Sequence, residues 1–163
     1  MSQTNWRTTI AALLVALAPL GPAPAWAQAV INVPNEDPAM EAAQAKARAG
    51  LPEFWKALDK PAPGERMFTL KVSVPIGGNN TEHIWVSGIE RLKNGRLSGR
   101  LDNVPRDIKD KKSGDRIEFE TKDISDWMFV RNGKIVGNET LRPLLSRMSK
   151  EQAGKYRAML EKP

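Results

Sequence analysis

The feature that most constrains the fold is a change to a hydrophobic period of two after residue 66. In residues 67–74, the apolar side chains of Phe68, Leu70 and Val72 alternate with polar ones, which is typical of a half-buried β-strand. Further strands are expected at residues 83–89, 97–101 and 115–120, and residues 127–136 are expected to form a hairpin. The pattern therefore predicts a β-sheet that is exposed to solvent on part of its surface.

Two Asn-Gly pairs interrupt this pattern, within residues 93–96 and 131–134. Two-residue hairpin turns need positive φ at both central positions, which Asn-Gly supplies, so each pair predicts an antiparallel hairpin. Gly88 and Gly99 lie inside predicted strands. Glycines at such positions indicate bulges or a close approach of another backbone.

Helical patterns bracket the strands. Asp37-Pro38 predicts an N-cap and a first helical turn, followed by a helix over 39–49 that Gly50 interrupts and Leu51-Pro52 restarts. A second helix is expected over 149–160, after a helical turn at 141–145. Ser149 and Gln152 have the spacing of a capping box at its start. The sequence predicts one α+β domain over residues 37–163. Its antiparallel sheet has five or six strands and is flanked by N-terminal and C-terminal helices.

The first 27 residues have the three-part layout of a secretory signal peptide. A short polar start with Arg7 precedes an apolar run at residues 8–20, and Ala25-Trp26-Ala27 provides a small-residue cleavage site. The apolar run is shorter than the roughly 20 residues that span a bilayer. We expect cleavage near Ala27, a flexible lead-in at residues 28–36, and an exported, periplasmic or secreted protein without a transmembrane segment.

Composition excludes several kinds of site. The chain has no cysteine, which rules out a catalytic thiol, a thiolate metal site and disulfides. Its formal net charge is +6. The basic residues of the connector at 104–116 are interrupted by aspartates and lack interleaved aromatic residues, so nucleic acid is not a predicted partner. The sequence predicts no metal site and no cofactor, and it leaves the oligomeric state open.

Five residues form the predicted binding surface: His83, Trp85, Asp126, Trp127 and Arg142. His83, the single histidine, shares a strand face with Trp85. Asp126 could orient the imidazole of His83 or pair with Arg142, or it could cap the adjacent turn while the Trp127 indole lies in the core. Arg142 could bind an anionic group, or its segment could be a helix entry capped by Asn138 or Thr140.

The absence of catalytic motifs favours a binding function. The sequence contains no phosphate loop, dinucleotide fingerprint, zinc helix or nucleophile elbow. We therefore expect a non-enzymatic domain that binds a protein or a cell-envelope ligand. One alternative is a small cell-envelope hydrolase that uses Glu82 or Asp126 with His83. The other is an inhibitor or immunity-type protein.

Several segments also resemble a bacterial family of unknown function, the YegJ-like domain (DUF2314). The resemblance rests on residues 51–55, 82–86, 99–105, 114–115, 124–128, 132–138 and 140–142. It implies a compact α+β domain that occurs alone or beside other domains, with no established activity, cofactor or catalytic residue. Glu139 departs from the family pattern, which has an aromatic residue at this position.

Overall fold

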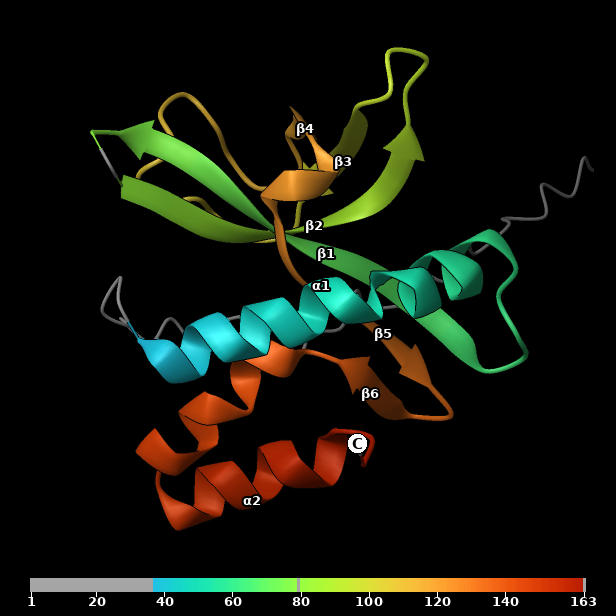
Figure 1. The fold of residues 1–163 in the computed structure, drawn as a ribbon, viewed down its shortest axis with the longest axis vertical. Coiled ribbons are helices and arrows are strands. Elements are labelled where there is room, and N and C mark those ends of the chain that lie inside the picture. The colour runs from blue at the N-terminus through green and yellow to red at the C-terminus, as the bar shows by residue number, and fades with distance from the viewer. Residues whose placement is uncertain (1–36, 79, 163) are drawn as a thin grey trace, which may run out of the picture.

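The structure is a computed structural model that describes residues 37–78 and 80–162. Within these residues, six strands form one antiparallel sheet in the order β4-β3-β2-β1-β5-β6, with helix α1 across one face (Figure 1). The elements are α1 (Pro38–Asp59), β1 (Glu65–Gly77), β2 (Asn80–Arg91), β3 (Leu97–Leu101), β4 (Arg116–Phe119), η2 (Thr121–Asp123), β5 (Ile124–Arg131), β6 (Lys134–Gly137), η3 (Glu139–Leu141), η4 (Pro143–Arg147) and α2 (Lys150–Met159). The predicted α+β class is confirmed. The predicted signal peptide and lead-in, residues 1–36, lie outside the described residues.

Helix α1 is continuous over 22 residues, so the predicted interruption at Gly50 is wrong. Its start is as predicted: the Asp37 carboxylate accepts the N–H of Ala39 at 3.0 Å. Gly50 has a packing role instead, because a Cβ there would lie 2.8 Å from Cζ2 of Trp127 on strand β5. The sequence pattern could not show this contact, since it depends on a residue far along the chain.

The main core lies between α1 and the sheet. Phe54 is fully buried and packs edge-on against Phe68 of β1, with ring centroids 6.0 Å apart. The alternating residues of the central strands complete this core, which includes Leu70, Val72, Ile84, Val86, Ile124, Trp127 and Phe129. The period of two that predicted the strands therefore marks the face that α1 covers.

The two Asn-Gly pairs make different turns. Asn132 and Gly133 both have positive φ, at 49° and 80°, and Arg131 pairs with Lys134, which is the predicted two-residue hairpin. In the β2–β3 connection only Gly95 has positive φ, and five residues, 92–96, lie between the end of β2 at Arg91 and the start of β3 at Leu97. The prediction of a two-residue turn there is wrong, because the longer loop needs positive φ at one position only.

Both predicted strand glycines have the expected roles. Gly88 has a φ of 58° and lies within a register shift between β2 and β3. Gly99 has close neighbours, since a Cβ there would lie 3.1 Å from Cβ of Val86.

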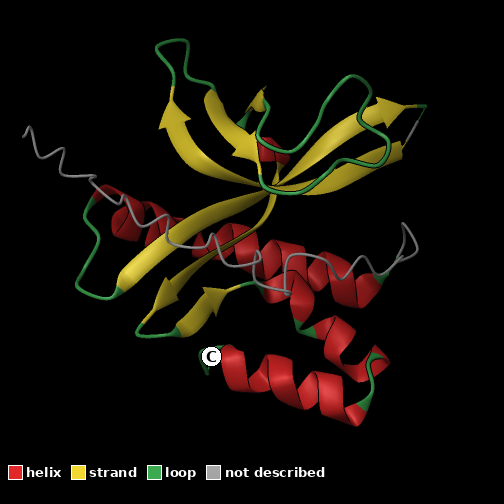
Figure 2. Cartoon of the chain, turned by 180° about the vertical axis from the view of Figure 1, so that it is seen from behind, coloured by secondary structure: helices red, strands yellow, loops and turns green. Residues whose placement is uncertain are grey.

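A second, smaller core covers the opposite face at the β5–β6 end. Met128 and Ile135 pack there against Leu145, Ala153 and Leu160 from the C-terminal helices. Figure 2 shows α2 beside this end of the sheet, far from β3 and β4. The capping box of Ser149 and Gln152 begins α2 as predicted. After α2 the chain bonds to β6, where the Glu161 N–H donates to the Ile135 carbonyl at 2.8 Å.

Within the described part of the chain, none of the helices has both the length and the apolar character needed to cross a membrane.

Candidate functional site

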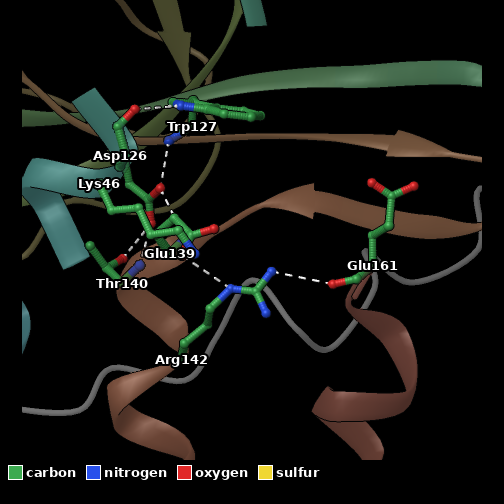
Figure 3. Close-up of polar contacts among 8 residues, drawn as sticks. Lys46, Asp126, Trp127, Glu139, Thr140, Arg142 and Glu161 are labelled. Atoms are coloured by element: carbon green, nitrogen blue, oxygen red, sulfur yellow. Dashed lines mark hydrogen bonds and ion pairs between the residues drawn. The ribbon is translucent and has the colours of Figure 1, made fainter. Parts of the chain in front are cut away.

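A groove of about 330 Å³ lies between α1, strand β6 and the C-terminal segment. Its lining comes from four regions of the chain: Lys46, Gly50 and Glu53 of α1; Trp127 of β5; Val136 and Gly137 of β6; and Glu139, Arg142, Glu161 and Lys162 after the sheet. Figure 3 shows the polar contacts that hold its walls. The groove thus joins an apolar floor to charged walls.

The floor is built around the indole of Trp127, which is buried with 4% of its surface exposed. Its Nε1 donates to the carbonyl of Ala47 at 2.7 Å, so α1 fixes the ring. Gly137 contacts the other side of the ring, since a Cβ there would lie 2.7 Å from Cε3. Gly137 also has a φ of 79°, where other residues are strained. Gly50 and Gly137 therefore allow the indole to fit and leave the floor without side chains.

The wall beyond β6 is held by a fully buried carboxylate, Asp126. It accepts the N–H groups of Thr140 at 2.8 Å and Glu139 at 3.2 Å, and the Thr140 hydroxyl at 2.6 Å. Asn138 makes no side-chain cap. The 3-10 helix η3 is therefore capped by Asp126 of β5, and not by Asn138 or Thr140, the two caps considered from the sequence.

A buried lysine completes this support. Lys71 of β1 donates from Nζ to Oγ1 of Thr140 at 3.0 Å, and Thr140 in turn donates to Asp126. Burial lowers the pKa of the Lys71 ammonium and raises the pKa of the Asp126 carboxyl, while the charge of each partner opposes the shift of the other. The Thr140 hydroxyl bridges the two charges and fixes the start of the wall.

Glu139 and Arg142 form the exposed side of the same wall. The Glu139 carboxylate lies 3.0 Å from Nζ of Lys46 and 3.2 Å from Nε of Arg142. Arg142 Nη2 also donates to the backbone carbonyl of Glu161 at 3.3 Å (Figure 3). The buried Nε of Arg142 has no well-aligned hydrogen-bond acceptor among the described residues. One carboxylate is thus shared by two cations.

At the other end of the groove, one guanidinium is shared by three carboxylates. Arg131 lies 2.8 Å from Glu65, 3.1 Å from Glu53 and 3.4 Å from Glu161. The backbone N–H of Ala62, and after it Arg131, lower the pKa of the Glu65 carboxyl. The carboxylates of Glu53 and Glu161 are the more exposed members of this group, at 51% and 38%.

The structure divides the five predicted binding residues. Trp127 and Arg142 line the groove, whereas His83 and Trp85 lie around Lys71 on the face opposite α1. Asp126 is buried beneath the wall and touches neither solvent nor ligand space. In the described part of the chain, Asp126 makes no hydrogen bond or ion pair with His83 or with Arg142.

His83 has a local partner instead. Its Nδ1 lies 2.9 Å from Oγ of Ser125. Desolvation and the Lys71 ammonium lower the pKa of the imidazole below its usual 6.5. Lys71 Nζ lies 5.2 Å from the centre of the Trp85 ring, a cation–π contact. Ser125 is buried, with 3% exposed, so this pair does not present an open nucleophile.

Glu82, the other carboxylate considered for hydrolysis, holds the connector after β3. It accepts the backbone N–H groups of Arg106 and Asp107 at 2.8 Å each and of Ile108 at 3.1 Å. Three backbone donors converge on one side chain. Its carboxylate therefore orders a loop.

The sequence analysis missed Lys46, Glu53, Glu139 and Glu161. Lys46, Gly50 and Glu53 follow an i, i+4, i+7 spacing, which places them on one side of a helix. With Gly50 assigned to the helix, this spacing would have predicted a shared helix face. No sequence pattern predicts the position of Glu161, because its place beside α1 depends on tertiary packing.

Comparison with known proteins identifies relatives without a described activity. The profile of a family described as "Uncharacterized protein conserved in bacteria (DUF2314)" matches residues 37–160. The uncharacterized protein YegJ of Escherichia coli K12 is 37% identical over 93 residues, which cover 56% of this chain and 60% of that protein. A Neisseria meningitidis serogroup B protein, provisionally named an ankyrin repeat protein, is 27% identical over 136 residues, 79% of this chain and 53% of that protein. The chain thus spans little more than half the length of these relatives. No solved structure matches it significantly.

Proposed function

The chain belongs to the DUF2314 family of uncharacterized bacterial proteins, and we propose that it is an exported, non-enzymatic domain that binds a cell-envelope ligand in the groove. Trp127 and Arg142 are the predicted residues that contact the ligand. Asp126 and Lys71 act as positioning residues behind the wall.

The observation that carries this proposal is that both candidate catalytic carboxylates, Asp126 and Glu82, are hydrogen-bonded to the protein itself. General acid–base catalysis needs a carboxyl group that can reach the substrate. Asp126 is fully buried and accepts backbone and hydroxyl donors, and Glu82 accepts three backbone N–H groups. With both carboxylates bound to the scaffold, binding is better supported than hydrolysis.

The groove has the properties of a binding site. Its volume is at the lower end of the roughly 300–1,000 Å³ found for ligand pockets. The Arg142 side chain lines the groove and is 24% exposed, and guanidinium groups bind planar anions in bidentate fashion. A small polar ligand with an anionic group fits these features.

Two further observations support the biological setting. The layout of residues 1–27 predicts export, which would expose the domain to cell-envelope material. The relative named for ankyrin repeats is about twice as long as its matched part, and ankyrin arrays present extended binding surfaces. The name of this relative fits a domain whose role is binding.

The test uses the protein that begins at Gln28, immobilised and exposed to the small-molecule fraction of a bacterial envelope extract. Compounds retained after washing are identified by mass spectrometry for the wild type, Arg142→Ala and Arg91→Ala. Arg91 is a matched control, because it also pairs with a carboxylate, Asp59, but lies outside the groove.

We expect the wild type and the Arg91→Ala variant to retain the same compounds and the Arg142→Ala variant to lose them, with all three folded by circular dichroism. Equal retention by Arg142→Ala would contradict the proposal. Turnover of an envelope substrate that Glu82→Gln or His83→Ala abolishes would also overturn it.

A further inference from the structure

We propose that the groove recognises a small zwitterion, of the size of an amino acid or a dipeptide. The ligand carboxylate lies at Lys46 and Arg142, and its ammonium group lies at Glu53 and Glu161. This inference rests on the proposed function and specifies the chemistry of the ligand.

The carboxylate end follows from a local excess of positive charge. Two cations, Lys46 and Arg142, share the single carboxylate of Glu139, which is 12% exposed. The Arg142 side chain keeps 24% of its surface exposed. A second carboxylate, supplied by a ligand, would balance the charge and could accept hydrogen bonds from the exposed part of the guanidinium.

The ammonium end follows from the opposite imbalance. Arg131 is the cation shared by Glu53, Glu65 and Glu161. Glu65 is enclosed, with 6% of its side chain exposed, whereas Glu53 and Glu161 line the groove. A ligand ammonium group beside these two carboxylates would offset the excess negative charge.

The arrangement of the two ends sets the size of the ligand. Arg142 lies between Glu139 on one side and the backbone carbonyl of Glu161 on the other, so both ends belong to one continuous groove (Figure 3). Its volume of about 330 Å³ accommodates one or two amino-acid residues above the indole and the bare glycines.

The test is calorimetric titration of the protein that begins at Gln28 with three probes and two variants. The probes are dialanine, N-acetyl-dialanine, which lacks the ammonium group, and dialanine amide, which lacks the carboxylate. The variants are Arg142→Ala and Glu53→Gln, with Arg91→Ala as the control outside the groove.

We expect dialanine to bind about tenfold or more tightly than either blocked probe, since each blocked end removes a charge-assisted contact. Arg142→Ala should weaken dialanine about tenfold and leave dialanine amide unchanged, while Glu53→Gln should weaken dialanine and leave N-acetyl-dialanine unchanged. Arg91→Ala should match the wild type for every probe.

Equal affinities for the three probes, or no measurable binding of dialanine, would overturn this inference. Such a result together with Arg142-dependent retention of envelope compounds would leave the proposed function in place. Failure of both experiments would remove both proposals.

Discussion

Trp127 is enclosed by two glycines that belong to different elements, Gly50 of α1 and Gly137 of β6. The indole also donates to the carbonyl of Ala47. One side chain therefore joins helix, sheet and groove floor. The two glycines are as important for this packing as the tryptophan, because a side chain at either position would overlap the indole.

Replacing Gly137 by alanine tests this arrangement against a matched glycine, Gly133. Both have φ near 80°, but a Cβ at Gly133 meets nothing within 4 Å, whereas one at Gly137 meets the Trp127 carbonyl and ring. We expect Gly133→Ala to cost about 1 kcal/mol from backbone strain, and Gly137→Ala about 3 kcal/mol or more because overpacking adds to it. Chemical denaturation measures both, and similar losses for the two variants would contradict the packing role.

His83 gives a prediction for pH. Its pKa is lowered in the folded state, first by desolvation and then by Lys71, from 6.5 in the unfolded chain. Its contribution to stability is complete above that value and is lost as the pH falls below it, because the unfolded chain binds the proton more readily. We expect the free energy of unfolding to fall as the pH drops below about 6.5, and His83→Gln to flatten that slope. An unchanged slope in the variant would show that the imidazole pKa is not lowered.

At the scale of elements, β1 was predictable because a period of two appears in its sequence, and the β5–β6 hairpin because of its Asn-Gly turn. All the predicted strands are present. The β5–β6 turn was predictable because Asn132 and Gly133 both need positive φ. The continuity of α1 was not predictable, since Gly50 reads as a break until Trp127 is placed against it. Local sequence patterns thus predict local geometry. The prediction for α1 was wrong because its structure depends on a contact with a residue distant in the sequence.

The structure places the five predicted binding residues in separate regions for a related reason. Asp126 and Trp127 are neighbours in sequence, but the carboxylate bonds to Thr140 while the indole packs against Phe54 of α1. A register shift in β5 between the partners of Lys71 and Val72 accompanies this arrangement. The sequence pattern does not predict a bulge of this kind. The predicted binding surface therefore combined residues that are close in sequence but separated in the sheet.

The connector between β3 and β4 provides a prediction at the same scale. Removing the carboxylate in Glu82→Ala should lower the protection of the 106–108 amides against hydrogen exchange, because it accepts all three N–H groups. The overall stability should fall by about 1–2 kcal/mol. Glu118→Ala is the control, since Glu118 pairs with the side chain of Arg96, which lies just before β3. Equal protection of 106–108 in the two variants would show that Glu82 does not order the loop.

For the whole molecule, the predicted export would determine which ligands the groove can meet. The apolar run and small-residue site of residues 1–27 predict cleavage after Ala27. Expression of the full sequence in a Gram-negative host should therefore yield a periplasmic protein whose amino-terminal residue is Gln28, as mass spectrometry of the purified chain would report. An intact chain that begins at Met1 in the cytosolic fraction would contradict export.

Charged residues lie in two regions of the fold, and their contacts differ between the two. Lys71, His83 and Trp85 lie on the face opposite α1, where the ion pairs and hydrogen bonds of the described residues serve the scaffold. Lys46, Arg142, Glu53 and Glu161 line the groove, where positive and negative charges are unevenly shared. We infer that the groove binds the ligand and that the residues of the opposite face stabilise the fold.

The most direct test of this division is a ¹H–¹⁵N correlation spectrum of the labelled chain, recorded while the envelope fraction is added. The account predicts shift changes at the amides of Gly50 and Gly137 and at the indole N–H of Trp127. Signals of His83 and Trp85 should remain in place. Changes confined to His83 and Trp85, with the three groove signals unmoved, would contradict it.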